Sequence, residues 1–118
     1  MEKAPPIDKQ AAMEVCDDDM ELFMEIVEVY LEDAPNLARK LKQAVMDEDA
    51  PLVEKFAHAL KGASGNICAE PVRELAMQIE RMGRENQLDA VRDVYRKFVK
   101  EFIRLKDNLD VMVAENGG

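Results

Sequence analysis

The chain has 118 residues, of which 47% are apolar and 35% are charged, and its formal net charge is −9. We expect one domain over residues 1–118, with an ordered core over about residues 7–113, because a chain of this length can bury roughly two-thirds of its unfolded surface. The excess of acids argues against a nucleic-acid or anionic-membrane surface, since binding to phosphates needs clustered cations. No run of 18 apolar residues occurs, so no transmembrane segment is expected.

The two cysteines, Cys16 and Cys68, lie far apart and form neither a CxxC pair nor a disulfide framework. No apolar run follows Met1, so we expect no secretory signal. These features predict a reduced, cytoplasmic protein. The starting methionine and the polar residues 114–118 lead us to expect a free-standing chain.

Apolar residues recur with helical spacing in four long stretches, preceded by a short one over residues 7–15. The first long stretch covers residues 20–45, with Asp18 or Asp19 as its N-cap. We expect Pro35 to kink or split this helix, because proline lacks a backbone donor and clashes with the preceding turn. Three methionines lie on the apolar stripes and are expected to fill the core: Met20, Met24 and Met82.

The second long stretch begins after Asp49 as N-cap, and the third ends near Gly83. The fourth covers residues 91–112, and Asn86 followed by Asp89 resembles a capping box at its start. Short connections between long amphipathic helices make neighbours antiparallel. The predicted fold class is therefore all-α, an up-down-up-down four-helix bundle with a short N-terminal accessory helix.

The only histidine, His58, lies on the second long helix, almost opposite its apolar stripe on a wheel of about 100° per residue. The same outward face carries five more residues: Glu54, Lys55, Lys61, Gly62 and Gly65. A glycine inside a helix costs about 1 kcal/mol relative to alanine, so Gly62 on a solvent face needs another explanation. We infer that the missing side chain lets another protein reach the imidazole, with Lys61 as a cation for a phosphate on the ring.

Two features of these helices remain open to more than one interpretation. Gly65 with Asn66 is also typical of a helix stop. The first long helix carries a second apolar line: Leu22, Ile26 and Val29. Either the accessory helix covers this line, or it is a docking patch for a partner domain. The acids of the same helix predict a solvated face: Glu21, Glu25, Glu28 and Glu32.

Residues 57–67, with the sequence AHALKGASGNI, resemble the His-x-x-Lys-Gly signature of histidine-containing phosphotransfer (Hpt) domains. The resemblance extends to the segment over residues 31–35 and to the third helix. It implies that His58 accepts a phosphoryl group from a receiver-domain aspartate and passes it to another receiver. In this scheme Lys61 stabilises the phosphate and Gly62 gives the partner access.

The chain departs from the family pattern at Cys68, where the family commonly has glycine followed by alanine. This position begins the turn into the third helix. We therefore expect the cysteine to alter the backbone of the turn and to leave the phosphoacceptor unaffected.

The resemblance implies receiver domains of response regulators and of hybrid sensor histidine kinases as partners. It also implies that Mg²⁺ is bound by the receiver, with no cofactor on this chain. We expect no nucleic-acid or membrane partner, and a monomer. Contact with the partner is expected at residues around the histidine and on the first long helix: Glu54, Lys55, Gly65, Leu22 and Ile26.

Motifs for other chemistry are missing from the sequence. It has no GxxxxGK[ST] loop, so we expect a phosphoryl carrier without kinase activity of its own. His58 with Glu54 is a poor metal pair, because zinc sites need three or four ligands. The competing interpretation is a non-catalytic helical adaptor that binds receiver or kinase domains without phosphotransfer. The presence of His58, Lys61 and Gly62 together favours the active carrier.

Overall fold

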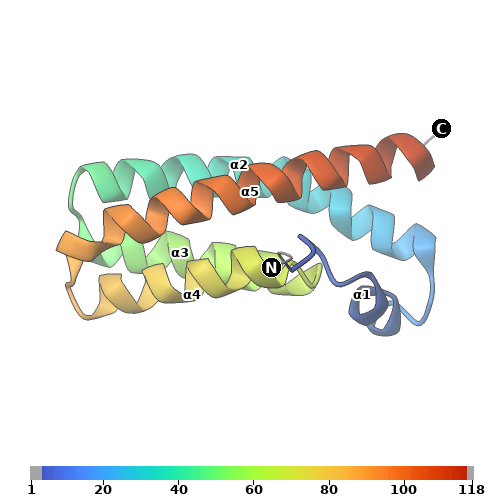
Figure 1. The fold of residues 1–118 in the computed structure, drawn as a ribbon, viewed down its shortest axis with the longest axis horizontal. Helices are drawn as coiled ribbons and strands as arrows, with labels where there is room; N and C mark the ends of the chain where they lie inside the picture. The colour runs from blue at the N-terminus through green and yellow to red at the C-terminus, as the bar shows by residue number, and fades with distance from the viewer. Residues whose placement is uncertain (1–3, 117–118) are drawn as a thin grey trace.

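The computed structural model describes residues 4–116, and this part of the chain contains five helices and no strand (Figure 1). The helices are α1 (Lys9–Val15), α2 (Met20–Met46), α3 (Ala50–Asn66), α4 (Glu70–Arg84) and α5 (Leu88–Asn116). Helices α2 to α5 alternate in direction and form a bundle, so the predicted all-α class is confirmed. Within residues 4–116, every helix is too short or too polar to cross a membrane.

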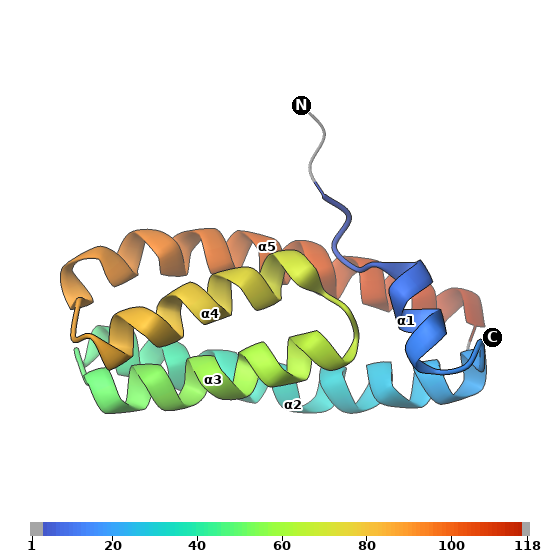
Figure 2. The ribbon, with the colours of Figure 1, turned by 90° about the horizontal axis from the view of Figure 1, so that it is seen from below.

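Helices α2 and α5 are much longer than the other two, with 27 and 29 residues against 17 in α3 and 15 in α4. They extend past the turn between α3 and α4, and α1 lies under this overhang (Figure 2). The backbone N–H of Asp8 donates to the carbonyl of Cys68 at 2.9 Å and ties the N-terminal segment to that turn. Ala12 and Cys16 are buried, so α1 closes the open end of the core.

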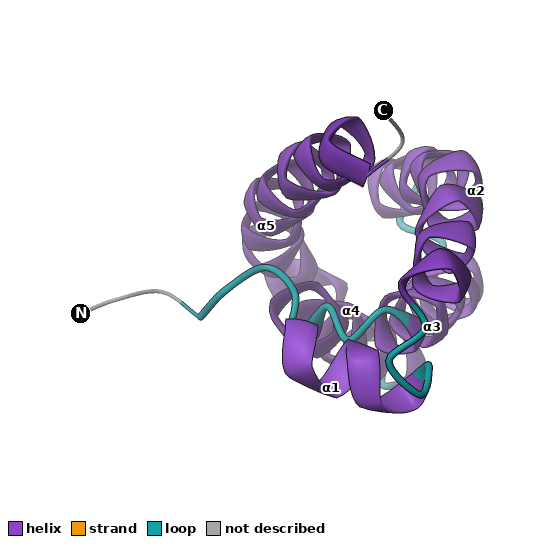
Figure 3. Cartoon of the chain, turned by 90° about the vertical axis from the view of Figure 1, so that its right-hand side faces the viewer, coloured by secondary structure: helices purple, strands orange, loops and turns teal. Residues whose placement is uncertain are grey.

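Viewed from the α1 end, helices α2 to α5 are arranged in a ring and α1 lies across its end (Figure 3). The buried side chains of these helices form one apolar core. The largest fully buried side chains include Phe23, Leu60, Ile79 and Phe98, one from each long helix. Tyr30 and Ser64 form a buried hydrogen bond of 2.9 Å between their hydroxyl oxygens, which fixes α2 against α3. Burial raises the pKa of Tyr30 to about 12, although the bond to Ser64 opposes the rise, so the phenol stays neutral.

Helix starts follow the predicted chemistry. The Asp19 carboxylate accepts a hydrogen bond from the backbone N–H of Leu22, and Asp49 accepts one from Leu52 in the same way. Pro35, by contrast, does not split α2, which continues from Met20 to Met46. The helix instead changes direction along its length (Figure 1), which accommodates the proline ring.

Met20 is 43% exposed, so its expected place in the core is wrong. At the other end of the chain, α5 continues to Asn116, past the expected end of the ordered core at residue 113. Residues 117–118 lie outside the described part of the chain.

The capping box predicted at Asn86 is wrong, because this residue ends α4 instead of starting α5. Its φ is 55°, in the left-handed region, whereas an N-cap has extended backbone. The N–H of Gln87 donates to the carbonyl of Met82 at 2.8 Å, and that of Asn86 donates to Gly83 at 3.2 Å. This pair of bonds is a Schellman motif with Asn86 in its left-handed position.

The turn after α3 uses the same motif. Cys68 has φ 57°, and the N–H groups of Ala69 and Cys68 donate to Ser64 and Gly65 at 2.9 and 3.1 Å. Helix α3 ends at Asn66, as the pair of Gly65 and Asn66 predicts, but the residue in the left-handed position is Cys68. Cys68 adopts the conformation that glycine favours, so the turn keeps its glycine-type backbone despite the side chain.

We expect Cys68→Gly to be more stable than Cys68→Ala by about 1 kcal/mol, because a Cβ in the left-handed conformation costs more than the added flexibility of glycine. Both variants lose the sulfur, so their difference isolates the backbone effect. Denaturant unfolding of the two proteins measures it. The control is Gly62→Ala in the interior of α3, where alanine should be more stable than glycine. Equal or greater stability of Cys68→Ala would contradict a strained turn.

Candidate functional site

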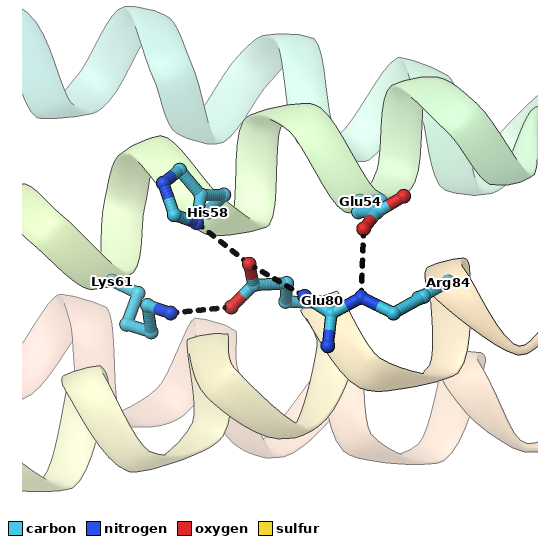
Figure 4. A network of polar contacts seen from close by, with 5 residues as sticks. All are labelled: Glu54, His58, Lys61, Glu80 and Arg84. Atoms are coloured by element: carbon cyan, nitrogen blue, oxygen red, sulfur yellow. Dashed lines mark hydrogen bonds and ion pairs between the residues drawn. The ribbon is translucent and has the colours of Figure 1, made fainter.

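His58 projects from the middle of α3 and its side chain is 67% exposed. Its Nδ1 atom lies 2.6 Å from Oε2 of Glu80 on α4 (Figure 4). The two helices approach closely at Gly83, where an added Cβ would lie only 2.7 Å from the backbone nitrogen of Glu54. This close packing holds the Glu80 carboxylate beside the imidazole.

Glu80 is the centre of a polar network that includes two cations. Its side chain is only 5% exposed. Its Oε1 lies 2.7 Å from Nζ of Lys61, and its Oε2 also accepts a bond of 3.2 Å from Nη2 of Arg84. Arg84 in turn donates from Nε to Oε2 of Glu54 at 2.9 Å. Two carboxylates and two cations thus balance one another beside the imidazole.

The ionisation of Glu80 determines which nitrogen of His58 is available. Burial raises the pKa of the Glu80 carboxyl, but the hydrogen bonds and charge attraction from Lys61 and His58 outweigh it, and the net shift is downward. The ionised carboxylate only accepts hydrogen bonds, so Nδ1 of His58 carries the hydrogen and donates it. In the neutral ring Nε2 then has the free lone pair, on the side of the ring away from Glu80 (Figure 4).

The surface next to His58 is open at Gly62, where an added Cβ would have no atom within 4 Å apart from its chain neighbours and the backbone of its own helix. Gly65 is different, since a Cβ there would contact Cδ of Arg73 at 3.4 Å. Lys55 lines the same shallow groove as His58 and Glu54, with its Nζ 5.5 Å from the ring centre of Phe56. The outward face predicted from the helix wheel is thus present, with Gly62 as its flat part.

Leu22 and Ile26 line a hollow between α2 and α3, whose α3 side is formed by Ala63, Asn66 and Ile67. Leu22 is exposed and Val29 is 57% exposed, so the interpretation in which the accessory helix covers this line is wrong. Helix α1 packs instead against the open end of the core, where Ala12 and Cys16 are buried. The interpretation of this apolar line as a docking patch stays a prediction. On α3 the hollow begins at Ala63, the residue after Gly62.

The sequence interpretation missed Glu80 and Arg84 as site residues. Glu80 had a signal, because it follows Ile79 and precedes Gly83 on the apolar face of α4, where an acid needs a counter-charge. Arg84 had none, since an arginine in the last turn of a helix is common without any site.

Cysteine and metal chemistry have little support in this arrangement. Cys16 and Cys68 are free and buried. Burial, followed by the negative charges of Asp8 and Glu70, raises the pKa of the Cys68 thiol and so disfavours the reactive thiolate. Among residues 4–116, no three His, Cys, Asp or Glu side chains are grouped so that they could hold a metal ion.

Comparison with known proteins agrees with this geometry. The model of the Hpt domain family matches residues 25–115, and the chain belongs to this family. The fold is similar to the crystal structure of histidine-containing phosphotransfer protein B from Pseudomonas aeruginosa PAO1, with a TM-score of 0.86 and 18% sequence identity. The match covers 96% of this chain and 98% of that protein. No match was found among the curated proteins. Family membership supports a phosphotransfer role in a phosphorelay.

We expect Glu80→Gln to change how stability depends on pH. A carboxyl with a lowered pKa in the folded protein contributes stability that is fully present above its unfolded value, about 4.3, and is lost as the pH falls through the folded value. The difference in unfolding free energy between wild type and variant should therefore be constant near neutral pH and shrink below about pH 4. Denaturant unfolding over a pH series measures it, and a difference independent of pH would show that the charge is not responsible.

Proposed function

We propose that this chain is a phosphoryl carrier of a phosphorelay. Nε2 of His58 accepts a phosphoryl group from an aspartyl phosphate of one receiver domain and delivers it to an aspartate of another. The observation that supports this most directly is the exposed imidazole held through Nδ1 by Glu80, which leaves Nε2 facing solvent. Membership of the Hpt family supports the same reaction class.

The reaction needs little covalent chemistry from this chain. The Nε2 lone pair forms a bond to phosphorus while the bond to the aspartate oxygen breaks, and the carboxylate leaves with its electron pair. The ring keeps the hydrogen on Nδ1 and becomes positively charged. Glu80 accepts from that nitrogen at 2.6 Å and stabilises the charge.

Lys61 is the cation best placed for the phosphoryl oxygens. It lies one helical turn after His58, and its ammonium already contacts Glu80 at 2.7 Å. An ammonium has three donors, so the one bond to Glu80 leaves others for phosphate. We expect Mg²⁺ and the acidic pocket to come from the receiver.

The receiver would dock over the face that carries His58. Gly62 keeps this face flat, and the hollow lined by Leu22 and Ile26 offers an apolar contact beside it. Glu54, Lys55 and Gly65 lie at its edges. The partners expected are receiver domains of response regulators and hybrid sensor histidine kinases.

We predict that His58→Gln abolishes acid-labile, alkali-stable labelling of this chain by phosphorylated receiver domains, because the chain has no other histidine. The exposed side chain is not part of the core, so helix content measured by circular dichroism should not change. Undiminished labelling of the variant would show that another residue carries the group. Receivers that bind the wild type without labelling it would support the adaptor interpretation.

We predict that Gly62→Gln slows transfer although it does not destabilise the fold. A helix interior favours glutamine over glycine by up to about 1 kcal/mol, and the position has open space. The new side chain would stand beside the imidazole and hinder approach to the reacting distance of roughly 3–3.5 Å. Thermal melts and single-turnover transfer rates measure the two effects.

Gly83→Ala is the matched control for this prediction. Its Cβ would clash with the backbone of α3, so it should lower stability by about 1–3 kcal/mol. The two glycine variants should thus change stability in opposite directions. If Gly62→Gln melts lower and transfers at the wild-type rate, Gly62 serves the backbone and not partner access.

A further inference from the structure

The hollow between α2 and α3 joins an apolar floor to an acidic rim. Leu22 is 41% exposed and Val29 is 57% exposed, so two large apolar side chains of this hollow face solvent. Two carboxylates line the same hollow, Glu25 and Asp33, and both are exposed. A surface of this composition suits a partner that brings apolar side chains to its centre and positive charge to its edge.

The acids of the rim have no cation of this chain beside them. Residues 10–38 contain no lysine or arginine. In the part of the chain that the structure describes, no ion pair involves an acid of this half of α2. Four of these acids recur every three or four residues and extend the rim along one side of the helix: Glu21, Glu25, Glu28 and Glu32. Like charges at this spacing repel one another, so the cations of a partner would relieve a cost that the folded chain already carries.

The carboxylates beside His58 are paired, in contrast to those of the rim. Glu80 is paired with Lys61, and Glu54 with Arg84. The groove that holds His58 lies between α3 and α4, whereas the hollow lies between α2 and α3. A partner that covers both regions therefore meets unpaired negative charge on the α2 side only.

We propose that the receiver domains that exchange a phosphoryl group with this chain carry lysine or arginine around the apolar side chains that they place in the hollow. This specificity rests on the proposed function, because it concerns the partners of the same transfer. Glu25 and Asp33 determine it by contact with the partner, away from the reacting atoms. A receiver with a basic edge gains attraction at both carboxylates, whereas one with an acidic edge is repelled and associates more slowly.

The two carboxylates also set where the cations of the partner must lie. Glu25 and Asp33 are eight residues apart on α2, which is about 12 Å along the helix axis. The exposed Val29 lies midway between them in the sequence. A receiver helix laid along α2 would therefore need an apolar residue with a cation three or four residues away on each side. Contact at both ends of the hollow restricts the orientation of the receiver over His58, which favours the alignment that transfer needs.

The test is single-turnover transfer from two phosphorylated receiver domains, one with lysine or arginine around its docking surface and one with acids there. The charge reversal Glu25→Lys with Asp33→Lys should lower the second-order rate constant for the basic receiver at least about tenfold, mainly through weaker binding, and raise it for the acidic one. The neutral variant, Glu25→Gln with Asp33→Asn, should fall between the wild type and the reversal. Added salt should slow transfer from the basic receiver to the wild type, because exposed charges are screened, and should affect the neutral variant much less.

Two controls separate docking from chemistry. The variant Asp89→Lys with Asp107→Lys makes the same charge change at exposed residues of α5 and should transfer like the wild type. Phosphoramidate phosphorylates histidine without a docked protein: the bond from Nε2 to phosphorus forms, the bond from phosphorus to the reagent nitrogen breaks, and ammonia leaves. All variants should react with it at nearly the same rate, which together with thermal melts verifies that His58 and the fold are intact.

Failure of the specificity and failure of the carrier function give different results. If neither receiver labels a wild type that phosphoramidate does label, the carrier function fails and the proposed specificity falls with it. The carrier function stands and the specificity alone is overturned if both receivers label the wild type at the same rate. The same conclusion follows if the charge reversal changes neither rate, or if the α5 variant loses as much as the reversal.

Discussion

The ionised carboxylate of Glu80, almost removed from water, is the constraint on which the arrangement of the site depends. A buried charge that loses its partners costs about 3–5 kcal/mol, so Glu80 needs Lys61, Arg84 and the Nδ1–H of His58 beside it. These partners come from both α3 and α4. The position of the imidazole is thus coupled to the packing of the two helices, and Gly83 sets how closely they approach.

The rest of the bundle makes this helix pair rigid. Helices α2 and α5 support α3 and α4 along their whole length, and the buried bond between Tyr30 and Ser64 fixes the back of α3 one turn beyond the site. Helix α1 closes the end where the long helices have no partner. A nucleophile on such a scaffold loses little freedom when a partner arrives, which favours transfer by positioning alone.

Periodicity was sufficient to predict four long helices, their order and the outward face that carries His58, because these depend on which residues must be buried. The N-caps at Asp19 and Asp49 were equally visible, since their side chains do the capping. The helix ends near Asn66 and Gly83 were indicated as well, but the left-handed positions at Cys68 and Asn86 were not, because a positive φ in a residue other than glycine leaves no mark in composition. Glu80 and Arg84 escaped as site residues because their roles arise from contacts between helices, which periodicity within one helix does not contain.

The position of Lys61 has a consequence for the energy of a phosphorylated state. Its ammonium is already matched by the Glu80 carboxylate at 2.7 Å, and Arg84 is held by Glu54. A phosphoryl group on His58 would therefore compete with Glu80 for positive charge instead of finding unsatisfied cations. If His58 carries the phosphoryl group as proposed, such competition would keep the phosphohistidine from becoming a thermodynamic sink, and the group could leave as readily as it arrives. A neutral network beneath the imidazole thus suits reversible passage better than storage.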